Sequence, residues 1–297
     1  MFESVKRLLK TKDVEYKENK CLSELSPMRI GGAARIVIFP ESPDDLIFCV
    51  STLISLGVKY KVLGRMSNVL PPDKTYDGAI IRTDKINRIE ISGNTICVQT
   101  GVTMPALANR AALCGLSGLE ELSGIPGSVG GLISGNAGAF GKETADILVS
   151  AALYAPNDGR TFSINRKELA FGYRKSLLKT ESYILLSAKL SLLSDDTENI
   201  QARIARYKAL RREKQPSEPS LGSTFKRPSK GYASKMLDEC GLRGFRVGGA
   251  AISEKHAGFI VNYGGATAVD VKAIVKIASD AVYDKFGILL EREIEYL

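Results

Sequence analysis

The sequence predicts an α+β protein, in which helices and strands dominate different stretches of the chain. Three observations support this prediction: the chain starts with a strand, a helix and a strand, its middle is rich in short strands, and its last third returns to helices. Of the 297 residues, 44% are hydrophobic and 25% are charged. These values are typical of a globular protein and exclude disordered, collagenous and coiled-coil classes.

The first elements lie between residues 34 and 63. Ala34–Pro40 is a β-branched run and predicts a strand. Ser42–Leu56 has the apolar spacing of a helix, with Asp44 and Asp45 in its first turn. Tyr60–Leu63 predicts a second short strand, so the region begins as a β-α-β unit.

Strands dominate the middle of the chain. Only one clear helix is predicted there, at Met104–Cys114. Turns rich in glycine, asparagine and aspartate separate strands that are predicted within residues 79–84, 88–94, 95–101, 149–155, 159–164 and 182–193.

The last third predicts a further α/β piece. It should contain a helix from about Ile200, a Pro/Ser loop over 215–230, a helix at Ala233–Cys240, a strand pair within 248–262 and a long helix at Ala268–Phe286.

Composition excludes several classes of site. The five cysteines form no CxxC pair and have no metal-like spacing, which favours a reducing, cytoplasmic compartment and no metal. The single histidine, His256, excludes most His-based triads and relays. The longest uncharged stretch, 122–141, holds seven glycines and a proline, so no membrane span is expected. The amino-terminal segment also lacks the apolar core of an export signal.

The net charge of +8 should attract phosphates. A basic cluster on the predicted helix is either a solvated face or a wall beside a nucleotide diphosphate; it comprises Arg203, Arg206, Lys208, Arg211, Arg212 and Lys214. Basic and aromatic residues are not interleaved as in nucleic-acid binders, so no nucleic-acid partner is expected.

Two glycine-containing segments are candidate phosphate-binding turns. Residues 124–141 contain all seven of those glycines, which let backbone N–H groups approach a diphosphate closely; the alternative is a packing corner between sheet and helix. Residues 63–70 place Gly64, Ser67 and Asn68 after a strand, which suits phosphate oxygens or equally a turn capped by Ser and Asn.

Three other segments offer polar groups for chemistry. Residues 171–179 hold Arg174 behind Tyr173, either as a donor fork for a carboxylate or as a basic strand edge. Prolines bracket Ser223, which could donate a proton but lacks a nucleophile elbow. Alternation over 289–297 places Glu291, Glu293 and Glu295 on one strand face, either at an exposed edge or beside an active site.

Taken together and in order, the segments resemble the UDP-N-acetylenolpyruvoylglucosamine reductase family from about Leu25 to the C-terminus. The resemblance rests on MRIGG (28–32), LGRMSN (63–68), GIPGSVGG with GNAGAFG (124–141), FGYRKS (171–176), GSTFKRP (222–228), GGAAISEKHAGFIVN (248–262) and LERE (290–293). The short spacing after Arg174 resembles the shorter subtype, which lacks a tyrosine-bearing loop.

The resemblance implies a two-lobed FAD-binding fold of the vanillyl-alcohol-oxidase type with a C-terminal α/β domain for a UDP-sugar. Residues 1–85 and 86–200 would form the FAD-binding lobes, and 201–297 the substrate-binding domain. The last strand, about 288–297, either stays in that domain or returns to the FAD lobes.

The resemblance also implies a cytoplasmic enzyme of peptidoglycan precursor synthesis. NADPH would reduce FAD, and the enolpyruvyl UDP-sugar would then enter the same cleft and accept the hydride. Arg174 and Glu293 would stabilise the enol-like intermediate, and Ser223 would donate a proton. No membrane and no obligate protein partner are implied.

The binding residues follow from the same motifs. Tyr173, Lys214, Arg227 and His256 match substrate contacts, although His256 equally suits a histidine satisfied between strands. The expected FAD contacts are Gly64, Arg65, Met66, Ser67, Asn68, Gly124, Ile125, Pro126, Gly127, Ser128, Gly130, Gly131, Asn136, Gly138 and Ala139.

Three residues depart from the family pattern. Met66 replaces a glycine, so either the turn avoids positive φ or the pyrophosphate approach is altered. Arg227 replaces an asparagine, and Pro27 a threonine. Two alternatives to this function are another FAD oxidoreductase of the same fold and a non-catalytic nucleotide-binding module.

Overall fold

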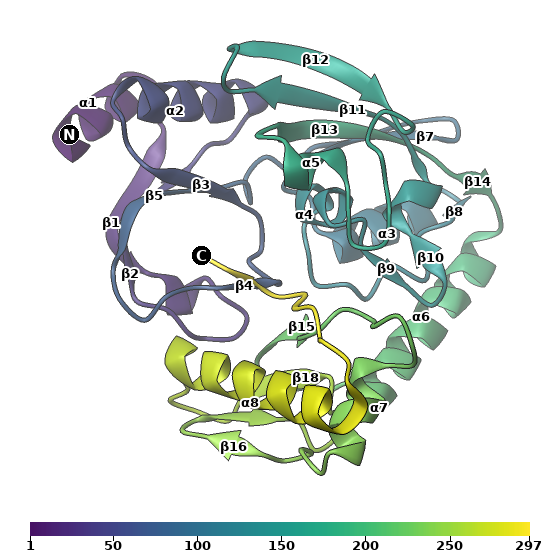
Figure 1. The fold of residues 1–297 in the computed structure, drawn as a ribbon. Coiled ribbons are helices and arrows are strands. Elements are labelled where there is room, and N and C mark those ends of the chain that lie inside the picture. Colours follow the sequence, from purple (N-terminus) through teal and green to yellow (C-terminus); the bar gives the residue numbers. More distant parts are fainter. The chain divides into compact units, whose positions relative to one another are not determined.

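The computed structural model describes residues 1–297 and divides them into two compact units (Figure 1). Unit 1 comprises Met1–Asn19, Arg35–Arg65 and Asp77–Leu210, and unit 2 comprises Lys20–Ala34, Met66–Tyr76 and Arg211–Leu297. Each unit is therefore assembled from three separate stretches of the chain.

The first sheet belongs mainly to unit 1. Its strand order is β1 (Glu15–Cys21), β2 (Ala33–Phe39), β5 (Tyr76–Arg82) and β3 (Tyr60–Leu63), with β3 parallel to β5. Helices α1 (Phe2–Thr11) and α2 (Pro43–Ser55) share its apolar core. Ser42 begins α2 as predicted, because its hydroxyl accepts a hydrogen bond from the Asp45 N–H at 3.1 Å.

The second sheet of unit 1 is antiparallel. Its order is β12 (Arg160–Asn165), β11 (Leu148–Ala155), β13 (Ile184–Ser191), β7 (Thr95–Gln99) and β6 (Ile89–Ser92). Its core is shared with α3 (Met104–Leu113), α4 (Val129–Ser134) and the first half of α6 (Thr197–Lys214). The smaller elements are β8 (Leu116–Ser117) with β14 (Leu193–Ser194), β9 (Gly138–Ala139) with β10 (Lys142–Glu143), η2 (Thr144–Asp146) and α5 (Leu177–Thr180).

Unit 2 is built on an antiparallel sheet. The order is β15 (Ser220–Ser223), β18 (Phe259–Asn262), β17 (Ala250–Ile252) and β16 (Arg246–Val247), and the core includes α7 (Ala233–Glu239) and α8 (Ala268–Phe286). The unit also contains η1 (Leu22–Glu24) and the pair β4 (Val69–Leu70) with β19 (Glu295–Tyr296). The strand at the end of the chain thus pairs, in parallel, with residues near position 70.

Helix α8 begins at a strong double cap. Thr267 and Asp270 form a capping box, and the Asp73 carboxylate also accepts hydrogen bonds from the backbone N–H groups of Ala268 and Val269 at 2.7 and 3.0 Å. The helix ends at Gly287, whose φ of +66° suits glycine.

Most predicted elements are confirmed, and three predictions are wrong. Residues 124–141 contain a helix, α4, and the middle region contains a second short helix, α5, so Met104–Cys114 is not its only helix. The Pro/Ser loop contains β15. The C-terminal strand covers only two residues. Arg292 forms an isolated bridge with Phe225, and only Glu295–Tyr296 then pair with β4.

None of the helices has the length and apolar character needed to cross a membrane. No cluster of three or more His, Cys, Asp or Glu side chains could hold a metal ion.

Close packing generates a prediction for Gly130, inside α4, and Gly135, the C-cap residue of that helix. A Cβ on Gly130 would lie 2.1 Å from the Thr100 Oγ1, whereas one on Gly135 would lie no closer than 3.5 Å to any other group. We expect Gly130→Ala to lower the free energy of unfolding by about 1–3 kcal/mol despite the helix propensity of alanine. Gly135→Ala should change it by less than about 0.5 kcal/mol. Urea unfolding of both variants checks this, and equal stabilities would contradict the packing argument.

Candidate functional site

The two predicted glycine-containing turns meet in unit 1. Gly64 directly follows β3, and a Cβ at this position would lie 2.0 Å from the Ser128 Oγ. Ser128 is the N-cap residue of α4, and its hydroxyl accepts a hydrogen bond from the Gly131 N–H at 3.4 Å. The structure therefore brings the first turn against the start of the helix in the glycine-rich segment, residues 124–141.

The backbone around Ser128 fits a phosphate-containing cofactor. Ser128 is 2% exposed, and its backbone N–H donates no hydrogen bond within the chain. A buried N–H without an acceptor normally requires a water or a ligand. Gly124 and Ile125 are half-buried and Pro126 is exposed, so the backbone before the helix stays accessible. These features match the donors that a dinucleotide such as FAD needs.

The rest of the first turn belongs to unit 2. Met66 has a φ of +55° and is 3% exposed, so the alternative in which this turn avoids positive φ is wrong. Methionine is uncommon in this conformation, and burial of its side chain offsets the backbone cost. The Asn68 Nδ2 donates a hydrogen bond to the Glu293 carbonyl at 3.0 Å. The Asn68 carbonyl accepts one from the Glu295 N–H at 2.9 Å.

Asn136 fixes the second half of the glycine-rich segment. Its Nδ2 donates to the Glu143 Oε2 at 2.8 Å and to the Gly172 carbonyl at 3.0 Å. Its Oδ1 accepts from the Ala145 N–H at 3.1 Å and from the Thr144 hydroxyl at 3.3 Å. All of its side-chain capacity is used inside unit 1, and its backbone N–H donates to the Ile133 carbonyl at 3.1 Å, so Asn136 shapes the segment through bonds within the protein.

Arg174 lies at the tip of a tight turn. Gly172 and Lys175 exchange backbone hydrogen bonds of 3.0 and 3.1 Å, and Arg174 between them has a φ of +54°. Its guanidinium lies 4.9 Å from the centre of the Tyr173 ring and donates to the Asn136 carbonyl at 3.5 Å. A bulky residue held at positive φ is a strained position of the kind found at functional sites.

Ser223 and Glu293 lie on neighbouring stretches of backbone in unit 2. The Thr224 carbonyl accepts hydrogen bonds from the N–H groups of Glu293 at 2.9 Å and Ile294 at 3.4 Å. Ser223 itself is exposed at the end of β15, next to Gly222 with a φ of +77°. The Lys226 side chain pairs with the Glu291 carboxylate, so Glu291 has a cation partner of its own.

His256 lies close to this group. Its Nδ1 accepts a hydrogen bond from the Gly258 N–H at 3.1 Å, and its ring packs edge-on against Phe259, the residue that pairs with Ser223. Burial lowers the pKa of His256, so the imidazole is neutral at pH 7 and can donate only through Nε2.

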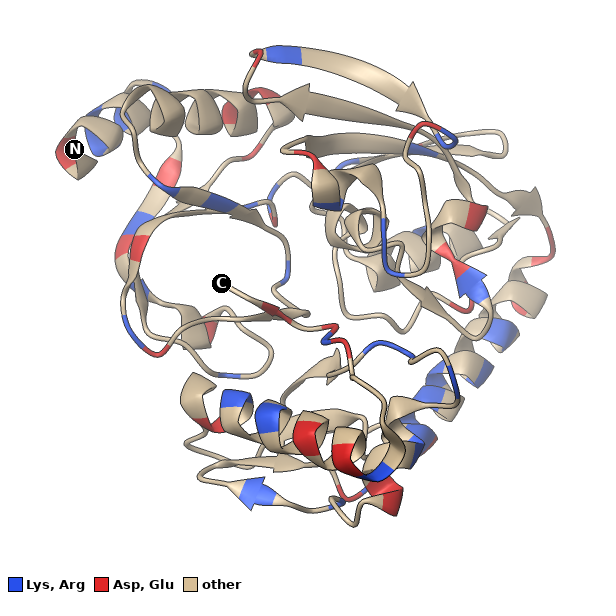
Figure 2. Cartoon of the chain, viewed as in Figure 1, with Lys and Arg blue, Asp and Glu red and all other residues tan.

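Two other predicted substrate contacts are exposed. The Arg227 guanidinium stacks over the Tyr232 ring at 4.5 Å, and Lys214 is the last residue of α6. Lys and Arg follow one another along α6 (Figure 2). Arg203 of the basic cluster on α6 fits neither predicted alternative, a solvated side chain or a cation beside a nucleotide diphosphate, because it forms ion pairs with Glu120 and Asp195.

Two residues that organise these groups were not predicted from the sequence. Thr224 connects the Ser223 loop to the C-terminal segment through its carbonyl, and only its place beside Ser223 could have indicated it. Glu143 accepts from Asn136, and a buried amide opposite a carboxylate is not visible in a local sequence pattern.

Two family models match the chain. One describes an FAD binding domain and matches residues 34–165, and the other describes the C-terminal domain of UDP-N-acetylenolpyruvoylglucosamine reductase and matches residues 215–297. The reductase of Caldicellulosiruptor bescii is 43% identical over 97% of this chain and 93% of its own length. That of Thermosipho melanesiensis is 42% identical over 90% of each chain.

Solved structures show a similar fold. The UDP-N-acetylenolpyruvylglucosamine reductase of Thermus caldophilus aligns with a TM-score of 0.80 and 34% identity over 95% of this chain and 98% of its own. Berberine bridge enzyme of Eschscholzia californica aligns with a TM-score of 0.51 and 17% identity over 65% of this chain and 44% of its own, which is a likeness of fold alone. The predicted fold class is confirmed.

The bonds of Asn136 generate a prediction. Asn136→Asp would place a carboxylate against Glu143 and the Gly172 carbonyl, and we expect it to cost about 2 kcal/mol or more of stability at pH 7. The loss should shrink towards pH 5, because protonation restores a donor. Asn165→Asp is the control, since the Asn165 Oδ1 only accepts, from the N–H groups of Lys167 and Glu168. Thermal unfolding across this pH range checks both, and equal losses would contradict the assignment.

Proposed function

We propose a function from the premise that the chain belongs to the UDP-N-acetylenolpyruvoylglucosamine reductase family, as the identity of 43% over 97% of the chain shows. The protein is an FAD-dependent oxidoreductase that uses NADPH to reduce UDP-N-acetylglucosamine enolpyruvate to UDP-N-acetylmuramate, a precursor of peptidoglycan. The single observation that carries this proposal is the match of one chain to both an FAD binding domain and the C-terminal domain of the reductase.

The cofactor contacts are proposed on the two turns described above. Residues 64–68 and the glycine-rich segment would hold FAD mainly through backbone N–H groups, since the Asn68 and Asn136 side chains are engaged within the protein. When bound, FAD supplies the two-electron carrier between NADPH and the enolpyruvyl group. In this proposal residues 1–85 and 86–200 form the FAD-binding lobes, and residues 201–297 bind the UDP-sugar.

Ser223, Glu293 and Arg174 are proposed as the catalytic residues. The Ser223 hydroxyl would donate a proton to the carbon beside the substrate carboxylate; a serine is a weak acid, so this requires a strongly basic carbon. The Arg174 guanidinium would bind the carboxylate and, with Glu293, stabilise the charge that develops there. The backbone link from Thr224 to Glu293 supports joint action of Ser223 and Glu293.

The remaining proposed contacts are to the UDP-sugar. Tyr173, Lys214, Arg227 and His256 would bind it, and the neutral His256 would serve as a hydrogen-bond donor through Nε2 and not as a cation. NADPH and the UDP-sugar would use one cleft in turn. We place the enzyme in the cytoplasm, where these substrates are made, and assign it no metal, nucleic-acid or obligate protein partner.

An absorbance titration tests the function. We expect the purified protein to show flavin bands near ~450 nm that bleach with NADPH without oxygen and return on addition of the enolpyruvyl UDP-sugar. Bleaching without return would favour another FAD oxidoreductase of the same fold. A colourless protein that FAD cannot reconstitute would favour a non-catalytic nucleotide-binding module.

The proton-donor role of Ser223 has a separate test. Ser223→Ala should leave bleaching by NADPH near its wild-type rate and slow the return of colour at least about a hundredfold, because only the second half-reaction needs the proton. Ser229→Ala, in the same loop and also exposed, should match the wild type in both steps. Stopped-flow absorbance measures each step, and equal losses of Ser223→Ala in both would remove the role.

A further inference from the structure

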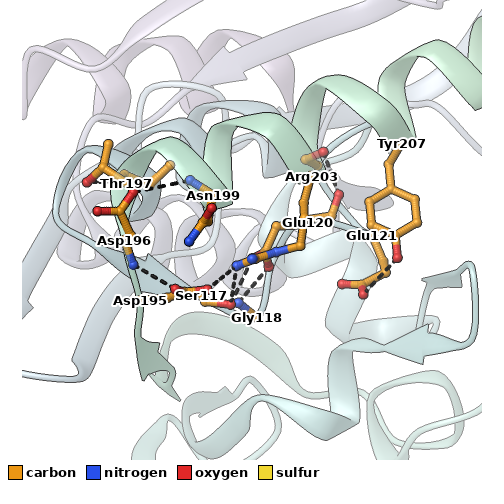
Figure 3. A network of polar contacts seen from close by, with 12 residues as sticks. Ser117, Gly118, Glu120, Glu121, Asp195, Asp196, Thr197, Asn199, Arg203 and Tyr207 are labelled. Atoms are coloured by element: carbon orange, nitrogen blue, oxygen red, sulfur yellow. Dashed lines mark hydrogen bonds and ion pairs between the residues drawn. The ribbon is translucent and has the colours of Figure 1, made fainter.

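Two residues of α6 contact the stretch that leads into the glycine-rich segment. Arg203 and Tyr207 are four positions apart and therefore lie on one face of the helix. Figure 3 shows their side chains reaching Glu120 and Glu121, which come shortly before Gly124. All four residues belong to unit 1.

Arg203 pairs with the buried Glu120 carboxylate, while the Arg203 side chain itself is 37% exposed and also pairs with Asp195. The Glu120 Oε1 accepts from the Arg203 Nε at 3.1 Å and from its second guanidinium nitrogen at 2.8 Å. The Ser117 hydroxyl and the Gly118 N–H donate to the same carboxylate at 2.8 and 2.7 Å. Glu120 is only 2% exposed. Burial alone would raise the pKa of Glu120, but the hydrogen bonds from Arg203, Ser117 and Gly118 outweigh it and lower the pKa.

A chain of short-range hydrogen bonds connects Glu120 to the start of the glycine-rich segment. The Ser123 hydroxyl donates to the Glu120 carbonyl at 2.7 Å, and Ser123 is fully buried. The Ile125 N–H donates to the Leu122 carbonyl at 2.9 Å, and the Gly127 N–H to the Ile125 carbonyl at 2.9 Å. Residues 120–124 thus form turns, the hydrogen bond from Gly127 to Ile125 continues towards α4, and the first residue of this stretch is fixed to α6.

Tyr207 reaches both sides of the segment. Its hydroxyl donates to the Glu121 Oε1 at 3.3 Å, and its ring lies 4.9 Å from the Phe140 ring. Phe140 stands near the far end of the segment with a φ of +52°. One side chain of α6 therefore contacts residues nineteen positions apart, on either side of α4.

We propose that Arg203 and Tyr207 are positioning residues that hold the glycine-rich segment in the shape that receives FAD. Seven glycines give this segment a large conformational entropy in the absence of restraint, and fixing its two ends to one helix removes much of it before the ligand arrives. The proposal rests on the proposed function, because FAD binding is the property that this preorganisation serves.

Hydrogen exchange tests the restraint without relying on FAD binding. The measurement uses the full chain and two variants, Tyr207→Leu and the double variant Glu120→Gln/Arg203→Met, which leaves no unpaired buried charge. We expect amides of residues 124–141 to exchange at least about tenfold faster in both, with little change in β12 and β13. The control is Asp158→Asn/Arg160→Met, which removes an ion pair of 3.1 Å elsewhere in unit 1 and should leave 124–141 unchanged. Unchanged exchange in 124–141, or an equal rise throughout unit 1, would overturn the proposal.

FAD affinity separates positioning from general stability. Arg203→Met alone leaves the Glu120 carboxylate buried and uncompensated, so its melting temperature should fall further than that of the double variant. If the Arg203–Glu120 pair positions the glycine-rich segment, the double variant should recover a melting temperature close to that of the wild type. It should still bind FAD at least about tenfold more weakly than the wild type. Recovery of both properties together would overturn the proposal. If the wild type itself binds no FAD, the proposed function fails, and the exchange measurement still decides whether α6 restrains the segment.

Discussion

Close backbone approach at three glycine contacts is the constraint on which unit 1 depends. Gly64 packs on Ser128, Gly130 on Thr100, and Gly101 on Thr83, and a Cβ at each glycine would come within about 2 Å of its neighbour. Gly64, Thr83 and Thr100 directly follow β3, β5 and β7. The ends of β3 and β7 are thereby tied to the start of α4, and the end of β5 is tied to Gly101, the residue that follows Thr100.

Unit 2 obtains its order from main-chain hydrogen bonds. The carbonyl of Thr224, a buried residue, accepts hydrogen bonds from two N–H groups of the C-terminal segment. The Asn68 side chain, which comes from a much earlier part of the sequence, donates a hydrogen bond to the same segment. Glu293 therefore lies between two anchors. The bond to the Thr224 carbonyl uses main-chain atoms alone, whereas the bond from Asn68 uses its side-chain amide, so both the chain topology and the identity of Asn68 set the position of Glu293.

The elements of the fold were predictable wherever they depend on local pattern. The apolar spacing and cap of α2, the β-branched run of β2, the short strand β3 and the full extent of α8 are all visible in the sequence. Helix α4 was not predicted, because glycines disfavour helices locally and the close contacts of Gly130 with Thr100 and of the N-cap Ser128 with Gly64 come from distant parts of the sequence. The C-terminal alternation was misread as a long strand, because strand pairing requires a partner that lies more than two hundred residues away. The motif residues of the candidate site were recognisable, whereas the side-chain bonds of Asn136 and Asn68 come from distant segments.

The division of unit 2 into three stretches has a consequence for synthesis on the ribosome. Residues 20–34 and 66–76 emerge early, but their apolar side chains, including Met28, Ile30 and Leu70, are buried against partners from residues 211–297. At about 5–20 residues per second, synthesis of the residues between the second stretch and the last takes roughly 7 to 27 seconds. During that time residues 77–210 of unit 1 are still being made, and the two hydrophobic segments lack their partners. A stop codon before residue 211 would therefore leave both segments without their partners for the life of the chain.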